Sequence, residues 1–228
     1  MIRTNLLILI GLIVMFSSCN KIDNYEAPNG DIYGKLTDKI TNQPLQTEQP
    51  NGFIVKLFEK GGSDNSPIIF PGKSDGSFEN ALIFQKEYRV SPTEGAFFPV
   101  NEVTINVGSR TEVNFDVIPF LAVQNVSVNV SSGKITSSYK ISRSQLGDKI
   151  VERKTLVSSI PTVNKVVFDF KAENDLSGIS DADILAAQYT DEVSGLTSGK
   201  IYYVRIAVRT DNSLKKYNYS EVYKVTIP

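Results

Sequence analysis

The chain has 228 residues, with 24 basic and 25 acidic side chains, one cysteine and no histidine. A formal net charge of −1 offers no basic field to a nucleic-acid backbone, so no nucleic-acid partner is expected. Without histidine the chain lacks the residue used most often as a general base and as a metal ligand. No Gly-x-Ser-x-Gly elbow and no phosphate-binding glycine loop is present either. We therefore predict a non-enzyme with no catalytic residue, no metal and no cofactor.

Residues 1–18 have the layout of a secretory signal peptide. Arg3 precedes an apolar run from Leu6 to Phe16, and two serines follow it. The run is shorter than the roughly 20 residues that a transmembrane helix needs. The segment Phe16-Ser17-Ser18-Cys19 resembles a bacterial lipobox, in which a signal peptidase cuts just before a lipidated cysteine. The resemblance implies that Cys19 is the mature N-terminus and the lipid anchor; the alternative is a free cysteine discarded with an ordinary secretory signal.

Residues 19–28 are predicted to be a polar tether, and the chain after them is predicted to be all-β. Apolar and polar residues alternate in six segments, which are 53–57, 103–107, 113–117, 126–130, 166–170 and 204–208. Period-two alternation places one set of side chains in a core and the other toward water. Many short strands separated by turns are typical of β-sandwiches. The exception is Asp181 to Gln188, where we expect a short helix or turn.

Two glycine-containing turns are predicted to close β-hairpins. The segment 107–112 contains Gly108, which is free to take a positive φ angle. The segment 74–78 contains the pair Asp75-Gly76, a common turn dipeptide.

A boundary near Pro119 and Phe120 divides the mature chain into domains at 29–120 and 121–228. The first domain resembles a carboxypeptidase regulatory-like domain, which is a transthyretin-like sandwich. The residues that carry this likeness are Ile32-x-Gly34-x-Leu36-x-Asp38, Pro44-Leu45, Asp75-Gly76 with Phe78, and Tyr88-x-Val90. The second domain resembles a fibronectin type III or immunoglobulin-like sandwich, because Leu196 and Tyr202 have the spacing of its tyrosine corner.

Lipobox, tether and two sandwiches in this order resemble an uncharacterised family of two-domain surface lipoproteins of Bacteroides-type bacteria. Such proteins are often encoded beside SusC/SusD-like pairs that import glycans. The resemblance implies a protein anchored in the outer membrane by its lipid and facing the cell exterior. Its expected role is a glycan-binding or accessory subunit of a polysaccharide uptake system, with polysaccharide and a SusC/SusD-like complex as partners. The alternative is a structural spacer or interaction scaffold that binds no glycan.

Four aromatic residues are candidates for stacking on sugar rings. Phe97 and Phe98 are adjacent, so on a strand they point to opposite faces and one ring is left exposed. Tyr217 and Tyr219 lie two residues apart and therefore share a face. The alternative is that all four rings fill the cores or corners of the sandwiches.

The densest acidic segment, 173–184, contains Glu173, Asp175, Asp181 and Asp183. Carboxylate oxygens suit calcium, but this spacing matches no EF-hand loop. A pair of carboxylates could also hydrolyse glycosides. We predict a solvated loop, with a calcium site and a catalytic pair as the alternatives.

Overall fold

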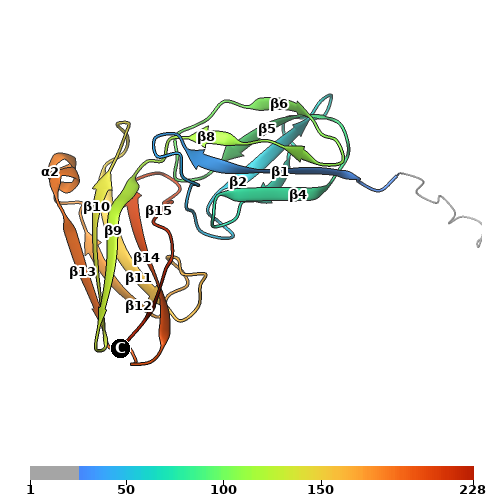
Figure 1. The fold of residues 1–228 in the computed structure, drawn as a ribbon. Helices are drawn as coiled ribbons and strands as arrows, with labels where there is room; N and C mark the ends of the chain where they lie inside the picture. Colours follow the sequence, from blue (N-terminus) through green and yellow to red (C-terminus); the bar gives the residue numbers. More distant parts are fainter. Residues whose placement is uncertain (1–25) are drawn as a thin grey trace, which may run out of the picture.

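The computed structural model describes residues 26–228, which form two β-sandwiches one after the other along the chain (Figure 1). Cys19 and the predicted signal peptide lie outside the described residues. The first described residues lie at the end of the first domain that is remote from the second, and the C-terminus lies at the far end of the second domain (Figure 1). No helix within 26–228 is long and apolar enough to cross a membrane.

The first domain packs two four-stranded sheets against each other. One sheet has the order β4-β1-β7, with β8 also paired to β1, and the other has the order β3-β2-β5-β6. The strands are β1 Gly30–Asp38, β2 Ile54–Glu59, β3 Ile68–Pro71, β4 Ser77–Ile83, β5 Glu87–Thr93, β6 Val103–Asn106, β7 Thr111–Glu112 and β8 Phe115–Val117. Neighbours pair antiparallel, except that β7 and β8 run parallel to β1.

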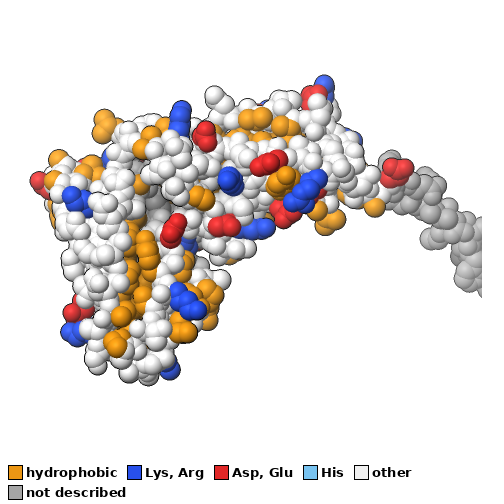
Figure 2. Space-filling model, viewed as in Figure 1, with side chains coloured by type: hydrophobic (Ala, Val, Ile, Leu, Met, Phe, Trp, Pro, Cys, Tyr) orange, Lys and Arg blue, Asp and Glu red, His pale blue; other side chains and the backbone are white. Residues whose placement is uncertain are grey.

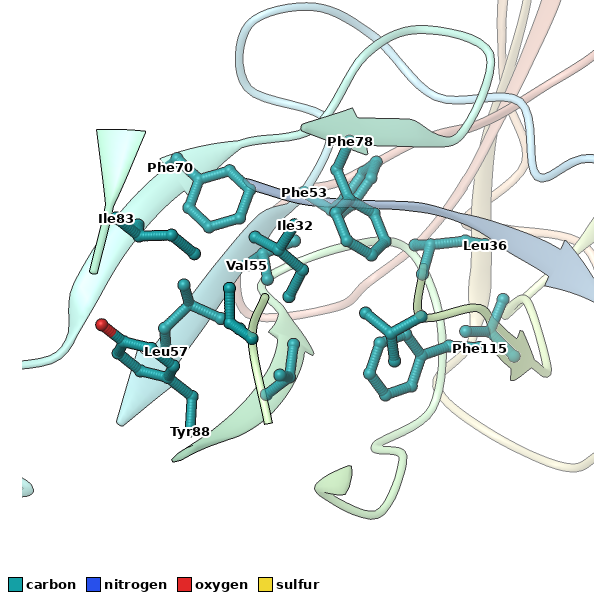
Figure 3. Close-up of a cluster of buried hydrophobic side chains, with 14 of the residues drawn as sticks. Ile32, Leu36, Phe53, Val55, Leu57, Phe70, Phe78, Ile83, Tyr88 and Phe115 are labelled. Atoms are coloured by element: carbon teal, nitrogen blue, oxygen red, sulfur yellow. The ribbon is translucent and has the colours of Figure 1, made fainter. Parts of the chain in front are cut away.

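The core of the first domain is rich in aromatic rings from both sheets (Figure 3). Phe78 has three ring neighbours, Phe53, Phe70 and Phe115, at centroid distances of 6.3 to 6.5 Å. Gly34 faces Phe78 and the backbone of Val113, and a Cβ atom there would come within 1.7 Å of the Val113 carbonyl oxygen. Glycine is therefore needed at this position of the sequence motif, because β1 and the segment before β8 are in backbone contact.

Neither predicted hairpin of the first domain pairs its two strands, so both predictions were wrong. The turn at Asp75-Gly76 forms as expected, with Gly76 at φ +80°, but β3 pairs with β2 whereas β4 pairs with β1. Similarly, the strands on either side of Gly108 belong to opposite sheets, and Gly108 does not adopt a positive φ. Both segments are corners of the sandwich, where the chain crosses from one sheet to the other.

The second domain packs a three-stranded sheet, β13-β10-β9, against a sheet of order β12-β11-β14-β15, in which β16 also pairs with β14. Its elements are β9 Ala122–Ser131, β10 Lys134–Ser142, β11 Ile150–Ser158, β12 Phe170–Asp175, α2 Asp181–Ala186, β13 Tyr189–Ser194, β14 Ile201–Thr210, β15 Asn218–Tyr219 and β16 Tyr223–Thr226. The all-β prediction of two tandem sandwiches is confirmed. The likeness of the two domains to transthyretin-like and fibronectin type III-like modules stays a prediction.

Tyr202 closes a corner of the second domain. Its ring is 4% exposed and packs edge-on against Phe170, with 6.1 Å between the ring centroids. Its hydroxyl accepts a hydrogen bond of 3.3 Å from the backbone N–H of Thr197. This is the arrangement that the Leu196 to Tyr202 spacing predicts.

Replacing Tyr202 by phenylalanine should therefore lower the free energy of unfolding by about 1 kcal/mol, the ordinary net value of one hydrogen bond. Tyr203→Phe is the matched control, because the neighbouring hydroxyl makes no hydrogen bond within the described residues. Urea unfolding measures both variants. Equal effects of the two substitutions would show that the corner hydrogen bond contributes nothing.

Strand β14 is buried on both faces, although the alternation of residues in 204–208 predicted that one face would be exposed to solvent. Val204, Ile206 and Val208 enter the core as expected, but Arg205 and Ala207 on the opposite face are also buried. Segment 159–169 covers that face, and Val163 packs there with Leu156, Tyr217 and Tyr219. The strand predicted at 166–170 was wrong over most of its length: only Phe170 lies in a strand, and Val166 is 76% exposed.

The two domains contact each other through polar side chains. Asn218 donates from Nδ2 to the carbonyl of Ala96 at 2.8 Å, and its Oδ1 accepts from the N–H of Leu121 at 2.9 Å. Tyr219 donates from its hydroxyl to Glu48 Oε2 at 2.6 Å. Glu48 belongs to the loop between β1 and β2, so this loop joins the first domain to β15 of the second.

Candidate functional site

The aromatic pair after β5 is held by a short backbone ladder. Phe98 donates its N–H to the carbonyl of Ile118 at 2.9 Å, and Phe120 donates to the carbonyl of Ala96 at 3.0 Å. The segment 96–98 therefore runs antiparallel to 118–120, and the bridge partners are Phe97 and Pro119. Extended backbone turns neighbouring side chains to opposite faces. As predicted, the two rings separate: Phe97 is 5% exposed in the core, and Phe98 is half-buried at the surface.

The ring of Phe98 is fixed between both domains. Phe120 meets it edge-on, with 5.1 Å between the centroids and 89° between the planes. On another side lies Gly147, where a Cβ atom would approach Phe98 Cζ to 2.9 Å. Gly147 belongs to the β10–β11 loop of the second domain. The glycine allows this loop to approach the ring, which is held in one orientation by its neighbours.

Phe98 lines a groove of about 510 Å³ at the surface. The apolar part of its wall includes Pro99, Val100 and Ile118. The polar side chains in the wall come from four separate segments and are Lys39, Asn101, Asn114, Asp116 and Gln145. A concave site with aromatic and aliphatic walls and several convergent polar groups is the usual composition of a small-ligand site.

Four of the five polar groups in this groove are uncommitted. Asn114 accepts from the N–H of Lys35 at 3.0 Å and donates to Glu112 at 2.8 Å. Within the described residues, the side chains of the other four make neither a hydrogen bond nor an ion pair; these are Lys39, Asn101, Asp116 and Gln145. They supply ammonium and amide donors together with carboxylate and amide acceptors. A ligand rich in hydroxyl groups matches this set, because each hydroxyl both donates and accepts.

The two candidate tyrosines do not form an exposed stacking platform. Tyr217 is 9% exposed, donates its hydroxyl to Glu152, and has Lys154 Nζ 5.3 Å from its ring centroid. Tyr219 is 6% exposed and lies under Arg205, whose guanidinium carbon is 4.5 Å from the ring centroid. Burial, followed by the nearby charge of Glu48, raises the pKa of the Tyr219 hydroxyl well above its ordinary value. The alternative interpretation, in which these rings pack inside the protein, describes both positions.

The acidic segment 173–184 does not gather its carboxylates. Glu173 pairs with Lys154 at 2.8 Å, and Asp175 accepts from the N–H of Ser177. Asp181 pairs with Arg143 at 3.2 Å, and Asp183 takes part in the cap of α2. No group of three or more candidate ligand side chains occurs among residues 26–228. Each carboxylate has a local structural partner instead.

The groove and the domain contact were largely invisible in the sequence. The groove residues are spread from Lys39 to Gln145, and no periodicity links them. One feature of the sequence did indicate the domain contact. Arg205 is a lone charged residue in the apolar stretch of β14. A charge at such a position needs either a buried partner or another segment packed over it.

Comparison with known families matches both domains to the same family. One family model, described as the N-terminal domain of a protein of unknown function (DUF3823), matches residues 31–118. A second, described as a domain of unknown function (DUF3823_C), matches residues 121–224. The chain belongs to the DUF3823 family. The comparison of this DUF3823 chain with curated proteins gives no match.

Crystal structures of similar proteins span almost the whole described chain. A DUF3823 family protein from Bacteroides uniformis is 26% identical, with a TM-score of 0.77 over 88% of this chain and 100% of that chain. A DUF3823 family protein from Parabacteroides merdae is 22% identical, with a TM-score of 0.74 and the same coverage. Another Bacteroides uniformis protein, described as a "putative carbohydrate binding protein", is 23% identical, with a TM-score of 0.76 and the same coverage.

Proposed function

We propose that this DUF3823 protein is a non-enzymatic glycan-binding protein whose site is the Phe98 groove. The observation that carries the proposal is the half-buried ring of Phe98 beside four uncommitted polar side chains. An aromatic face packs against the apolar face of a sugar ring while polar neighbours bind its hydroxyls. The name of one relative of the same fold, "putative carbohydrate binding protein", supports this function.

The setting that we propose is the outer membrane, facing the cell exterior, with Cys19 as the lipid anchor. Its partner there would be a SusC/SusD-like uptake complex. The chain enters the first domain at the end remote from the second (Figure 1). A tether at that end would hold the second domain and the groove away from the lipid surface. A weak site held at high local density captures a polymer with many repeats more effectively than its single-site affinity suggests.

The test is the substitution Phe98→Ala in soluble protein comprising residues 21–228. Affinity electrophoresis against a panel of plant, microbial and host polysaccharides measures the retardation of each variant. We expect at least one polysaccharide to retard the parent protein and Phe98→Ala to lose about tenfold in affinity, because stacking contributes on the order of 1 kcal/mol or more. Phe84→Ala is the matched control, because Phe84 is 40% exposed and lies outside the groove. Equal losses in the two variants would contradict this site.

A second candidate function, an interaction scaffold, is favoured by one feature of the second domain. Strand β9 is the edge of its sheet and carries no lysine, arginine or proline over ten residues. Edge strands without such residues are open to pairing with another chain. Figure 2 shows a band of hydrophobic side chains along the second domain, between the positions that β9 and β14 occupy in Figure 1. If no polysaccharide retards the parent protein, the scaffold function becomes the better explanation.

A further inference from the structure

Arg205 is a buried cation at the contact between the two domains. It is 2% exposed and lies in the middle of β14, between the core residues Val204 and Ile206. Arginine is almost never buried to this extent without a paired anion. The partners of its guanidinium therefore decide whether its charge is compensated.

All four hydrogen bonds of the guanidinium go to neutral oxygens. Nε donates to the carbonyl of Ser220 at 2.9 Å, and Nη1 donates to the carbonyl of Val163 at 3.4 Å. Nη2 reaches into the first domain, to Gln46 Oε1 at 3.4 Å and to the carbonyl of Ser74 at 3.5 Å. The three contacts at the terminal nitrogens are longer than the usual 2.7–3.2 Å and so are weak.

No described carboxylate lies within ion-pair distance of Arg205. Glu48 acts on it electrostatically, but the two oxygens of Glu48 already contact Tyr219 at 2.6 Å and Lys165 at 3.1 Å. Burial lowers the pKa of Arg205 to about 10, so the guanidinium remains protonated at neutral pH. A buried charge with no anion in direct contact is costly. The cost points to an anion that occupies the site in the working protein.

A cavity of about 230 Å³ adjoins the guanidinium between the two domains. A cavity of this volume can hold a small molecule or one unit of a larger one. Gln49 and Ser74 of the first domain line it, together with Thr162 and Val222 of the second. Gln49 and Thr162 are exposed, and their side chains make no hydrogen bond within the described residues, so they can receive a ligand from solvent.

We propose that this cavity binds the carboxylate of a small hydroxy acid, such as a sugar acid. The planar guanidinium matches a carboxylate, which would replace its long contacts with charge-assisted hydrogen bonds. The Thr162 hydroxyl and the Gln49 amide would bind hydroxyl groups of the same ligand. Because the ligand would contact both domains, it would also strengthen their association. This inference does not require the Phe98 groove to bind glycan.

The test is a titration of the soluble protein with sodium glucuronate at constant ionic strength. Two-dimensional NMR of the ¹⁵N-labelled protein measures the binding, with methyl glucoside as the neutral comparison and sodium sulfate as the inorganic anion. Arg205→Lys keeps the charge but loses the planar fork, and we expect it to weaken glucuronate binding at least about tenfold. Because Arg205→Lys could affect folding, a second variant, Thr162→Trp, blocks the exposed rim and leaves Arg205 intact. Ser213→Trp, at an exposed position that does not line the cavity, is its control.

Saturable shifts with glucuronate that are lost in Thr162→Trp and kept in both Ser213→Trp and Phe98→Ala would support the proposal. An equal response to methyl glucoside would overturn it, since the carboxylate would then be irrelevant. Equal affinity for sulfate would overturn the assignment to a hydroxy acid in favour of a free inorganic anion. Binding unchanged by Thr162→Trp, or no response to any of the three compounds, would remove this cavity as a site.

Discussion

Replacing Asp191 by asparagine should lower the free energy of unfolding of the second domain by about 3 kcal/mol. Asp191 is 5% exposed and lies at the centre of a polar network inside the sandwich. Its Oδ2 accepts from the hydroxyl of Tyr139 at 2.8 Å and from the hydroxyl of Thr155 at 2.9 Å. Its Oδ1 pairs with the guanidinium of Arg153 and accepts from Asn174 Nδ2 at 3.3 Å.

The expected cost comes mainly from the cation that would lose its partner. The side chain of Arg153 is only 12% exposed, and its Nε already lacks a hydrogen-bond partner. An asparagine at position 191 has nearly the same shape as aspartate, but it cannot neutralise this charge. Breaking a buried pair on one side leaves an uncompensated charge, which costs more than the pair itself contributes. Burial also raises the pKa of the Tyr139 hydroxyl, so Tyr139 stays a hydrogen-bond donor to this carboxylate.

Urea unfolding followed by circular dichroism measures this prediction. Asp148→Asn is the matched control in the same domain, because Asp148 is exposed and has no ion pair within the described residues. A double variant, Asp191→Asn with Arg153→Leu, should be less destabilised than the sum of its single variants, since it removes both charges. A loss below about 1 kcal/mol for Asp191→Asn would show that the network contributes no more than an exposed pair.

The strands were predictable from the sequence because the alternation of apolar and polar residues within a strand indicates which of its side chains are buried. Alternation at Phe53, Val55 and Leu57 places three side chains in a core, and all three are fully buried in the structure. Alternation says nothing about which sheet a strand joins, since the hydrogen-bond partner lies elsewhere in the chain. For this reason the turn at Asp75-Gly76 was predicted correctly, whereas the pairing across it was not.

The predicted strand at 166–170 failed for a different reason. The side chain of Asn164 accepts hydrogen bonds from the N–H groups of Val166 and Val167, at 2.8 and 3.0 Å. These bonds hold the backbone in a turn, which competes with extended structure. The valines that suggested a strand belong to a loop that covers β14. Local side-chain chemistry thus outweighed β propensity at this position.

The candidate site could be predicted only in part, because its residues come from segments that are distant in the sequence. The opposite orientation of Phe97 and Phe98 follows from extended backbone, and the sequence therefore indicated that one ring would be exposed. The polar side chains around Phe98 could not be predicted, because they come from strands and loops that meet only in the folded protein. Tyr217 and Tyr219 share a face as expected, but loop 159–169 and the first domain cover that face.

The contact between the domains is polar, and its geometry therefore depends on a few specific pairs. Hydrogen bonds cross the contact. One joins Asn218 to Ala96 at 2.8 Å, and another joins Tyr219 to Glu48 at 2.6 Å. Such pairs are directional, whereas apolar contacts tolerate sliding. Both the Phe98 groove and the Arg205 cavity are lined by both domains. Either site therefore requires that the domains keep one relative orientation.

Glu48→Ala should consequently separate the two domains in solution. Glu48 is 4% exposed, and its removal leaves Lys165 without its ion pair and Tyr219 without an acceptor for its hydroxyl. Leaving the buried Tyr219 hydroxyl without an acceptor costs about 1–3 kcal/mol, and the partly exposed Lys165 loses its ion pair as well. We expect the domain contact to lose most of its stability, because few other side chains cross it. Glu48→Gln keeps an acceptor for Tyr219 and should have a smaller effect.

Two measurements distinguish domain separation from simple unfolding. In small-angle X-ray scattering, Glu48→Ala should give a larger maximum dimension and a broader distance distribution than the parent protein. In calorimetry, the two domains should unfold in separate transitions, because they no longer stabilise each other. Glu221→Ala is the matched control: Glu221 is exposed near the same junction and forms no ion pair within the described residues. If Glu48→Ala scatters like Glu221→Ala, the orientation of the domains is fixed by the remaining contacts, and the proposed sites would survive the loss of this carboxylate.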